Sequence, residues 1–124
     1  MPKPIKRILK KNKEFSVNGR LWMECDNNRY FGPGPVELLQ RIDRTGSINQ
    51  ASKDMHMSYK KAWEIITTLN EHSSTPLVIT QTGGSKGGGS SISDEARELI
   101  ARYAILRERF KKFLEKETVR LNFS

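Results

Sequence analysis

Residues 45–70 read TGSINQASKDMHMSYKKAWEIITTLN, and this stretch fixes the fold class. Ser47 and Ser58 are both favourable helix N-caps, and Ser47 opens an S-x-x-Q pattern typical of a capping box. Beyond Ser58 the apolar residues recur at helical spacing, at Ala62, Ile66 and Leu69. The sequence therefore predicts a short helix from Ser47 to about Met55, a tight turn, and a second helix that ends near His72.

A small hairpin and a helix are expected before this stretch. From Phe15 to Phe31 apolar and aromatic residues dominate, and turn signals occur at Asn18-Gly19 and at Asp26–Asn28. The run GPGP follows, and Pro35 suits the first position of a helix that ends at Gly46. The apolar face of that helix consists of Val36, Leu39 and Ile42.

A second hairpin and a long helix are expected after it. Residues 77–82 are strand-like, residues 83–91 are rich in Gly and Ser, and Ile92 resumes the return strand. Ser93 is an N-cap, and the helix that it starts runs to about Glu117. The last residues alternate in polarity, which indicates a weak strand or a frayed end.

This order of elements is typical of an α+β, mainly α, winged helix-turn-helix fold with a long C-terminal dimerisation helix. The predicted organisation is a basic N-terminal tail over 1–14, the domain over 15–117 and a C-terminal tail over 118–124. Within the domain we expect the helix-turn-helix at 47–72, the wing at 77–92 and the last helix at 93–117.

The composition points to one small domain with an anionic partner. The chain has 124 residues, with 22 Lys and Arg against 14 Asp and Glu, and a net charge of +8. Its single cysteine, Cys25, cannot form an internal disulfide, and we interpret it as a core or strand residue. Neither a secretory signal nor a membrane-length apolar run is evident, so we expect a cytoplasmic protein without a membrane partner.

Double-stranded DNA is the expected partner, because the second helix of such a pair enters the major groove with its N-terminal residues nearest the bases. The candidate base-reading residues are Tyr59, Lys60, Trp63, Glu64 and Thr67, and Ser58 and Lys61 lie with them at the N-terminal end of the helix as candidate DNA contacts. Phosphate contacts are expected from Ser47, Asn49 and Lys86. Trp63 could instead be a core aromatic, and Lys60 and Lys61 could belong to a solvated face.

Catalytic, cofactor and metal sites are not expected. The stretch TGGSKGGGSS matches neither a Walker loop nor a dinucleotide fingerprint, because its glycines separate two candidate strands. His56 and His72 have no Cys or carboxylate partner at zinc spacing. No nucleophile with a base and no paired carboxylates are evident, so the alternatives to a DNA-binding regulator are an RNA-binding or a protein-interaction module.

The chain resembles the N-terminal domain of ModE-type molybdate-responsive transcription regulators over about residues 19–115. The most specific matches are GSI-x-x-A at 46–51, MSYKKAW at 57–63 and GG-x-K-GGG at 83–89. The resemblance implies a winged helix with a helix-turn-helix like that of LysR-type regulators. It also implies operator binding as a dimer and contacts from Ser58, Tyr59, Lys60, Lys61 and Trp63.

Two features depart from the family pattern. The wing reads GGSKGGGSS where the family usually has GGKGGGG, which leaves the wing contact open. The chain ends where full-length members continue into oxyanion-binding β-domains, so molybdate is not expected to bind it.

The last helix carries a seam typical of a coiled coil, which predicts a homodimer. Apolar residues alternate at spacings of three and four from Ala96 onward. The residues expected to form the dimer contact are Leu99, Tyr103, Leu106, Phe110 and Phe113. The alternative is a helix that folds back entirely onto its own domain.

Overall fold

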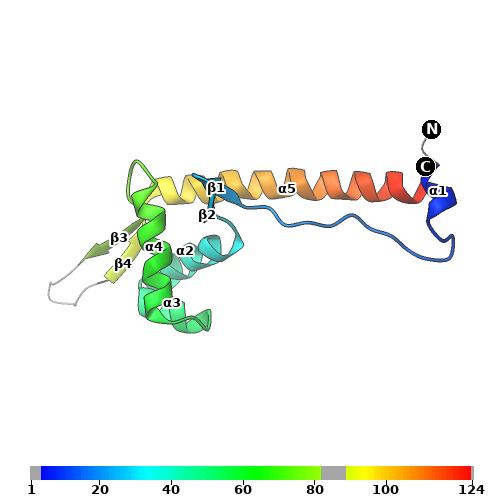
Figure 1. Ribbon diagram of the computed structural model, residues 1–124. Helices are drawn as coiled ribbons and strands as arrows, with labels where there is room; N and C mark the ends of the chain where they lie inside the picture. Colours follow the sequence, from blue (N-terminus) through cyan, green and yellow to red (C-terminus); the bar gives the residue numbers. More distant parts are fainter. Residues whose placement is uncertain (1–3, 82–88, 124) are drawn as a thin grey trace. The chain divides into compact units, whose positions relative to one another are not determined.

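The computed structural model describes residues 4–81 and 89–123, which form two compact units. One unit spans 22–103, and the other combines the segments before 22 and after 103. The described residues are mainly helical, with two separate two-stranded sheets, as expected for an α+β chain and compatible with a winged helix (Figure 1). Lys86 lies outside the described residues.

The unit over 22–103 contains both sheets and three complete helices. Its elements are β1 (Met23–Cys25), β2 (Asn28–Phe31), α2 (Pro33–Thr45), α3 (Ile48–Asp54), α4 (Tyr59–Glu71), β3 (Val78–Gln81), β4 (Gly89–Ile92) and the first part of α5 (Asp94–Phe123). Strands β1 and β2 pair antiparallel, as do β3 and β4, in which Val78 lies opposite Ile92. Helix α3 packs against α2 and α4, and β4 packs against α2.

The core of this unit is built from the inner faces of the helices and the strands next to them. Its fully buried side chains include Leu38, Leu39, Ile42, Ala62, Ile66 and Leu69. Tyr103 is only 2% exposed, and its ring meets that of Phe31 edge to face at 5.6 Å. Tyr103 therefore belongs to the core of its own chain, and its assignment to a dimer seam is wrong.

The first hairpin turns at Asp26 and Asn27, whose φ angles of 51° and 66° are both left-handed. Asn and Asp tolerate this conformation better than other residues with a side chain. The other turn signal, Asn18-Gly19, makes no hairpin, because residues 14–22 are not paired in a strand. Gly19 instead allows a close approach, since a Cβ atom there would lie 3.0 Å from Cζ of Phe110.

Helix α2 begins two residues earlier than expected, at Pro33. Both Pro33 and Pro35 fit the first turn of the helix, because backbone N–H groups there have no helical acceptor. The first N–H group that donates within the helix is that of Val36, which bonds to Gly32 O at 3.0 Å. The helix ends as expected at Gly46, which has a φ of 70° and donates to Ile42 O at 2.7 Å.

The second unit contains α1 (Ile5–Ile8), the segment up to residue 21 and the second part of α5. Helix α1 lies within the expected basic tail. Helix α5 continues to Phe123, so the expected end near Glu117 and the strand or frayed tail after it are wrong. Adding residues to a helix that already exists costs little free energy. In addition, polar side chains in this part of the helix form hydrogen bonds with the backbone of the segment before residue 22. Thr118 Oγ1 accepts from Val17 N at 2.9 Å, and Asn122 donates to Phe15 O at 2.8 Å.

None of the helices in the described ranges combines the length and the apolar character needed to cross a bilayer.

The side chain of Asn70 connects α4 to β3. Its Oδ1 accepts from Leu77 N at 2.8 Å and from Val78 N at 3.1 Å, and its Nδ2 donates to Val78 O at 3.2 Å. The Asn70 side chain thus provides hydrogen-bond partners for backbone groups of Leu77 and Val78 that are not paired within a helix or a strand.

Asn70→Ala should lower the free energy of unfolding by about 1–3 kcal/mol, because it leaves partly buried backbone groups unpaired. The matched control is Asn49→Ala, since Asn49 is exposed on α3 and its change should stay within about 0.5 kcal/mol. Urea denaturation followed by circular dichroism measures both. Equal effects of the two substitutions would contradict the role given to Asn70.

Candidate nucleic-acid interface

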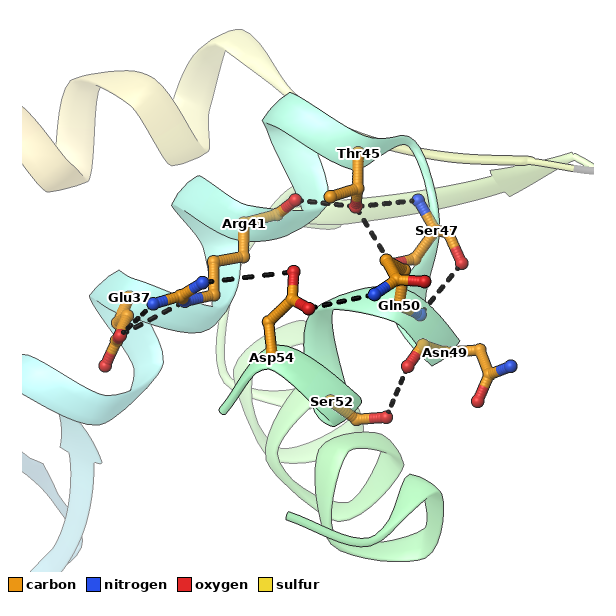
Figure 2. Close-up of polar contacts among 8 residues, drawn as sticks. All are labelled: Glu37, Arg41, Thr45, Ser47, Asn49, Gln50, Ser52 and Asp54. Atoms are coloured by element: carbon orange, nitrogen blue, oxygen red, sulfur yellow. Dashed lines mark hydrogen bonds and ion pairs between the residues drawn. The ribbon is translucent and has the colours of Figure 1, made fainter. Parts of the chain in front are cut away.

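A compact polar turn joins α2 to α3 (Figure 2). Thr45 Oγ1 lies 2.7 Å from Arg41 O, to which it donates, and accepts from Ser47 N at 3.2 Å. Ser47 Oγ accepts from Gln50 N at 3.0 Å, which confirms Ser47 as the N-cap. The Gln50 side chain donates to Asp54 Oδ1 at 2.8 Å instead of returning to Ser47 N, so the reciprocal half of the capping box does not form.

Residues 55–58 join α3 to α4. His56 has a left-handed φ of 55°, and Met57 N donates to Ser52 O at 3.0 Å, which closes the turn back onto α3. Ser58 Oγ accepts from Lys61 N at 3.0 Å, so the predicted N-cap of α4 is confirmed. Both helix starts are thus fixed by serine hydroxyls.

Helix α4 has one buried face and one exposed face. Ala62, Ile66 and Leu69 are at most 1% exposed, as their spacing predicted. The exposed predicted residues are Ser58, Tyr59, Lys60, Lys61, Glu64 and Thr67. Trp63 is half-buried, and its ring meets that of Tyr59 edge to face at 6.1 Å, so it lies at the border between the two faces.

Two of the three predicted phosphate-contacting residues lie at the start of α3. Asn49 is exposed in the first turn, and its side-chain amide points away from the other side chains drawn in Figure 2. Ser47 is half-buried, and its hydroxyl oxygen accepts the cap bond from Gln50 N, while its O–H can still donate. Lys86, the predicted wing contact, cannot be placed because it lies outside the described residues.

The first turns of the helices differ in charge. The first turn of α5 contains Asp94 and Glu95, which suit the positive end of the helix dipole. The first turns of α2, α3 and α4 contain no acid, and α4 carries Lys60 and Lys61 there. Among the described residues neither lysine forms an ion pair. The start of α4 is therefore a positive end that an anion would stabilise.

Strand β4 is hydrogen-bonded to Gly46, at the turn between α2 and α3, and the sequence did not predict this contact. Ser90 N donates to Gly46 O at 2.9 Å, and a Cβ on Gly89 would lie 3.5 Å from the same oxygen. The glycine content of residues 83–89 suggested only a wing. The bond depends on a register between elements far apart in the chain, for which the sequence carries no local signal.

Sequence spacing also missed a group of possible metal ligands. Cys25, Asp26 and His72 each offer one ligand atom, and these atoms all lie within 4.8 Å of one another. His72 is an exposed C-cap, as expected for a surface or capping histidine, but the fold also brings the β1–β2 turn to the end of α4, which spacing in the sequence could not show. His56 is not part of the group.

Comparison with known proteins gives a consistent result, although no family model matches the chain. A molybdenum transport protein ModE from Azotobacter vinelandii is 36% identical over 83% of this chain and 38% of the relative. A transcriptional regulator ModE from Haemophilus influenzae is 40% identical over 62% of this chain and 30% of the relative. A DNA-binding transcriptional dual regulator ModE from Escherichia coli is 36% identical over 69% of this chain and 33% of the relative.

The chain spans about a third of the length of these curated relatives. Over most of its own length it is similar to proteins named as ModE and as transcriptional regulators.

Proposed function

We propose that the chain is a ModE-like transcription regulator that binds specific sites in duplex DNA through a winged helix-turn-helix. In this proposal α3 and α4 are the helix pair, β3 and β4 are the strands of the wing, and α4 is the recognition helix. The observation that carries it is the polarity of α4. Its apolar face is fully buried, while its exposed N-terminal turn has two lysines and no acid.

The candidate DNA contacts would have two different tasks. Tyr59, Lys60, Glu64 and Thr67 would reach base edges in the major groove, with Ser58, Lys61 and Trp63 beside them. Asn49 and Ser47 on α3, together with Lys86, would contact phosphates, which positions the protein without reading sequence. Two neighbouring lysines at a helix start suit both tasks, because a protonated amine can bind guanine O6 and N7 or a phosphate.

The ligand, the cellular location and the absence of enzymatic activity are predictions from the sequence. The relatives' names mention molybdenum and a pterin, but these names belong to proteins of which the chain spans about a third. We do not expect molybdate to bind this chain. We also expect a cytoplasmic protein, and neither an enzyme nor a cofactor-dependent one.

A homodimer is part of the proposal, because part of α5 presents apolar side chains to solvent. Leu106 is 40% exposed and Phe113 is 54% exposed. The ring of Phe113 stacks on that of half-buried Phe110, with 6.5 Å between the ring centroids. Leu99 is half-buried, whereas Tyr103 is buried in its own chain and is not part of the proposed dimer contact. A second copy of the helix would cover this patch and place two recognition helices on a pseudo-palindromic operator.

Lys61→Glu should stabilise the free protein and weaken DNA binding. An acid at this position favours the helix dipole by about 0.3–1 kcal/mol and completes an S-x-x-E capping box with Ser58. This gain exceeds the repulsion from Glu64, about 0.2–0.5 kcal/mol. In the complex Lys61, beside the base-reading residues, would also contact a phosphate, so its loss should reduce the slope of log K against log salt by about 0.9.

Fluorescence anisotropy with an operator selected from genomic fragments, at several salt concentrations, measures the binding part. The matched control is Lys112→Glu, an equal change of charge at an exposed position of α5 that should leave affinity much less affected. Binding of the wild type that is no tighter to selected than to random duplex would contradict the proposed function. Tighter binding to single-stranded RNA would favour the alternative module.

Leu106→Asp combined with Phe113→Asp should convert a dimer into a monomer, because each substitution places a charge in the proposed seam. Sedimentation equilibrium at roughly tens of micromolar protein measures the change. Ile105→Asp is the control, since Ile105 is 52% exposed but lies outside the seam. A monomeric wild type, or a double variant that stays dimeric, would refute the dimer.

A further inference from the structure

We propose that Cys25, Asp26 and His72 form a binding site for one zinc ion. Cys25 ends β1, Asp26 is the first residue of the turn that follows, and His72 is the C-cap of α4. Their three ligand atoms lie within 4.8 Å of one another, although the residues are far apart in the sequence. All three belong to the unit over 22–103.

The donor set selects the type of ion. A thiolate, an imidazole and a carboxylate are the three ligand types that zinc uses in proteins, and three protein ligands leave the fourth tetrahedral position for water. Calcium and magnesium prefer sites made of oxygen atoms alone, so they should compete poorly. When zinc binds, the Cys25 thiol releases its proton to water and the sulfur becomes a thiolate ligand.

His72 makes a hydrogen bond of the kind that is common among zinc-binding histidines. Its Nδ1 lies 2.8 Å from the carbonyl oxygen of Thr68, one turn back on α4. A proton on Nδ1 donates to this oxygen, which leaves the lone pair of Nε2 for a metal. The ring also meets Tyr30 edge to face at 6.1 Å, which restricts its rotation.

The hairpin is held against the end of α4 without any metal. The Tyr30 hydroxyl lies 3.5 Å from Leu69 O and is in hydrogen-bond contact with the hydroxyl of Ser73. Ser73 in turn donates to Leu69 O at 2.6 Å. The site is thus largely assembled before zinc arrives, which reduces the entropy lost on binding.

Only a small adjustment of side chains is needed. Ligand atoms around a tetrahedral zinc ion lie about 3.3–3.8 Å apart, given bond lengths of about 2.0–2.3 Å. Asp26 and His72 are exposed and Cys25 is half-buried, so the site is accessible from solvent. Side-chain rotations can shorten the distances between the ligand atoms from at most 4.8 Å to those of a tetrahedral site. Bound zinc would then join the β1–β2 turn to the end of α4 and stabilise the folded state.

The test uses the full chain, purified with a chelator and a reductant that does not bind metals. Zinc affinity is measured by competition with a chromophoric chelator, and cobalt replaces zinc for spectroscopy. Thiolate coordination gives a near-ultraviolet charge-transfer band, and tetrahedral cobalt gives strong visible absorption. The variants are Cys25→Ser and His72→Gln, and the control is His56→Asn, which removes the other histidine and tolerates its left-handed φ.

One equivalent of zinc should bind to the wild type and to His56→Asn, and each ligand variant should bind it at least about 100-fold more weakly. At a zinc concentration about ten times Kd, Tm should rise by about 4–8 °C in the wild type and not in the two variants. Circular dichroism without metal verifies that the variants are folded. Absence of stoichiometric binding, or binding that survives both ligand substitutions, would overturn the site.

Discussion

The structure depends on the burial of one face of α4. Ala62, Ile66 and Leu69 are enclosed between α3, β2 and the rest of the core, and this contact fixes the rotation of α4 about its own axis. Once that rotation is set, the residues between the apolar positions must face outward. Lys60, Glu64 and Thr67 are therefore exposed as a consequence of core packing. A lysine-rich first turn is an electrostatic cost to the free chain, which a bound polyanion would offset.

A single residue, Gly46, connects the neighbouring elements through its backbone. Its N–H ends α2 by donating to Ile42 O, its left-handed φ turns the chain toward α3, and its carbonyl accepts from Ser90 N on β4. A helix end, a turn and a strand therefore share one residue. A side chain at this position would be strained by the φ angle, which explains why glycine is needed here.

The sequence was most informative where local chemistry determines structure. Ser47, Ser58 and Ser93 were identified as caps because a serine hydroxyl satisfies a backbone N–H three residues later, and all three do so. The exposed and buried faces of α4 followed from helical spacing. The predictions failed where distant segments decide the outcome. Helix α5 passes Glu117 because residues near 17 engage Thr118, and Tyr103 is taken into the core by Phe31.

The two candidate sites also differ in whether local sequence or distant segments determine them. The exposed residues of α4 could be named from the sequence, because they belong to one continuous helix. The group formed by Cys25, Asp26 and His72 could not, because its members meet only after the hairpin packs on the end of α4. Spacing rules for zinc sites work for ligands supplied by one local motif, and this group combines a β-turn with a helix end.

The central claim is that the exposed start of α4 lies in the DNA groove. Titration of the isotopically labelled full chain with a selected operator duplex, followed by amide chemical shifts, tests it most directly. The account predicts that the largest shifts fall on residues 58–67, with smaller ones at the start of α3 and little change at the β1–β2 turn. Largest shifts at that turn, with residues 58–67 unaffected, would contradict it.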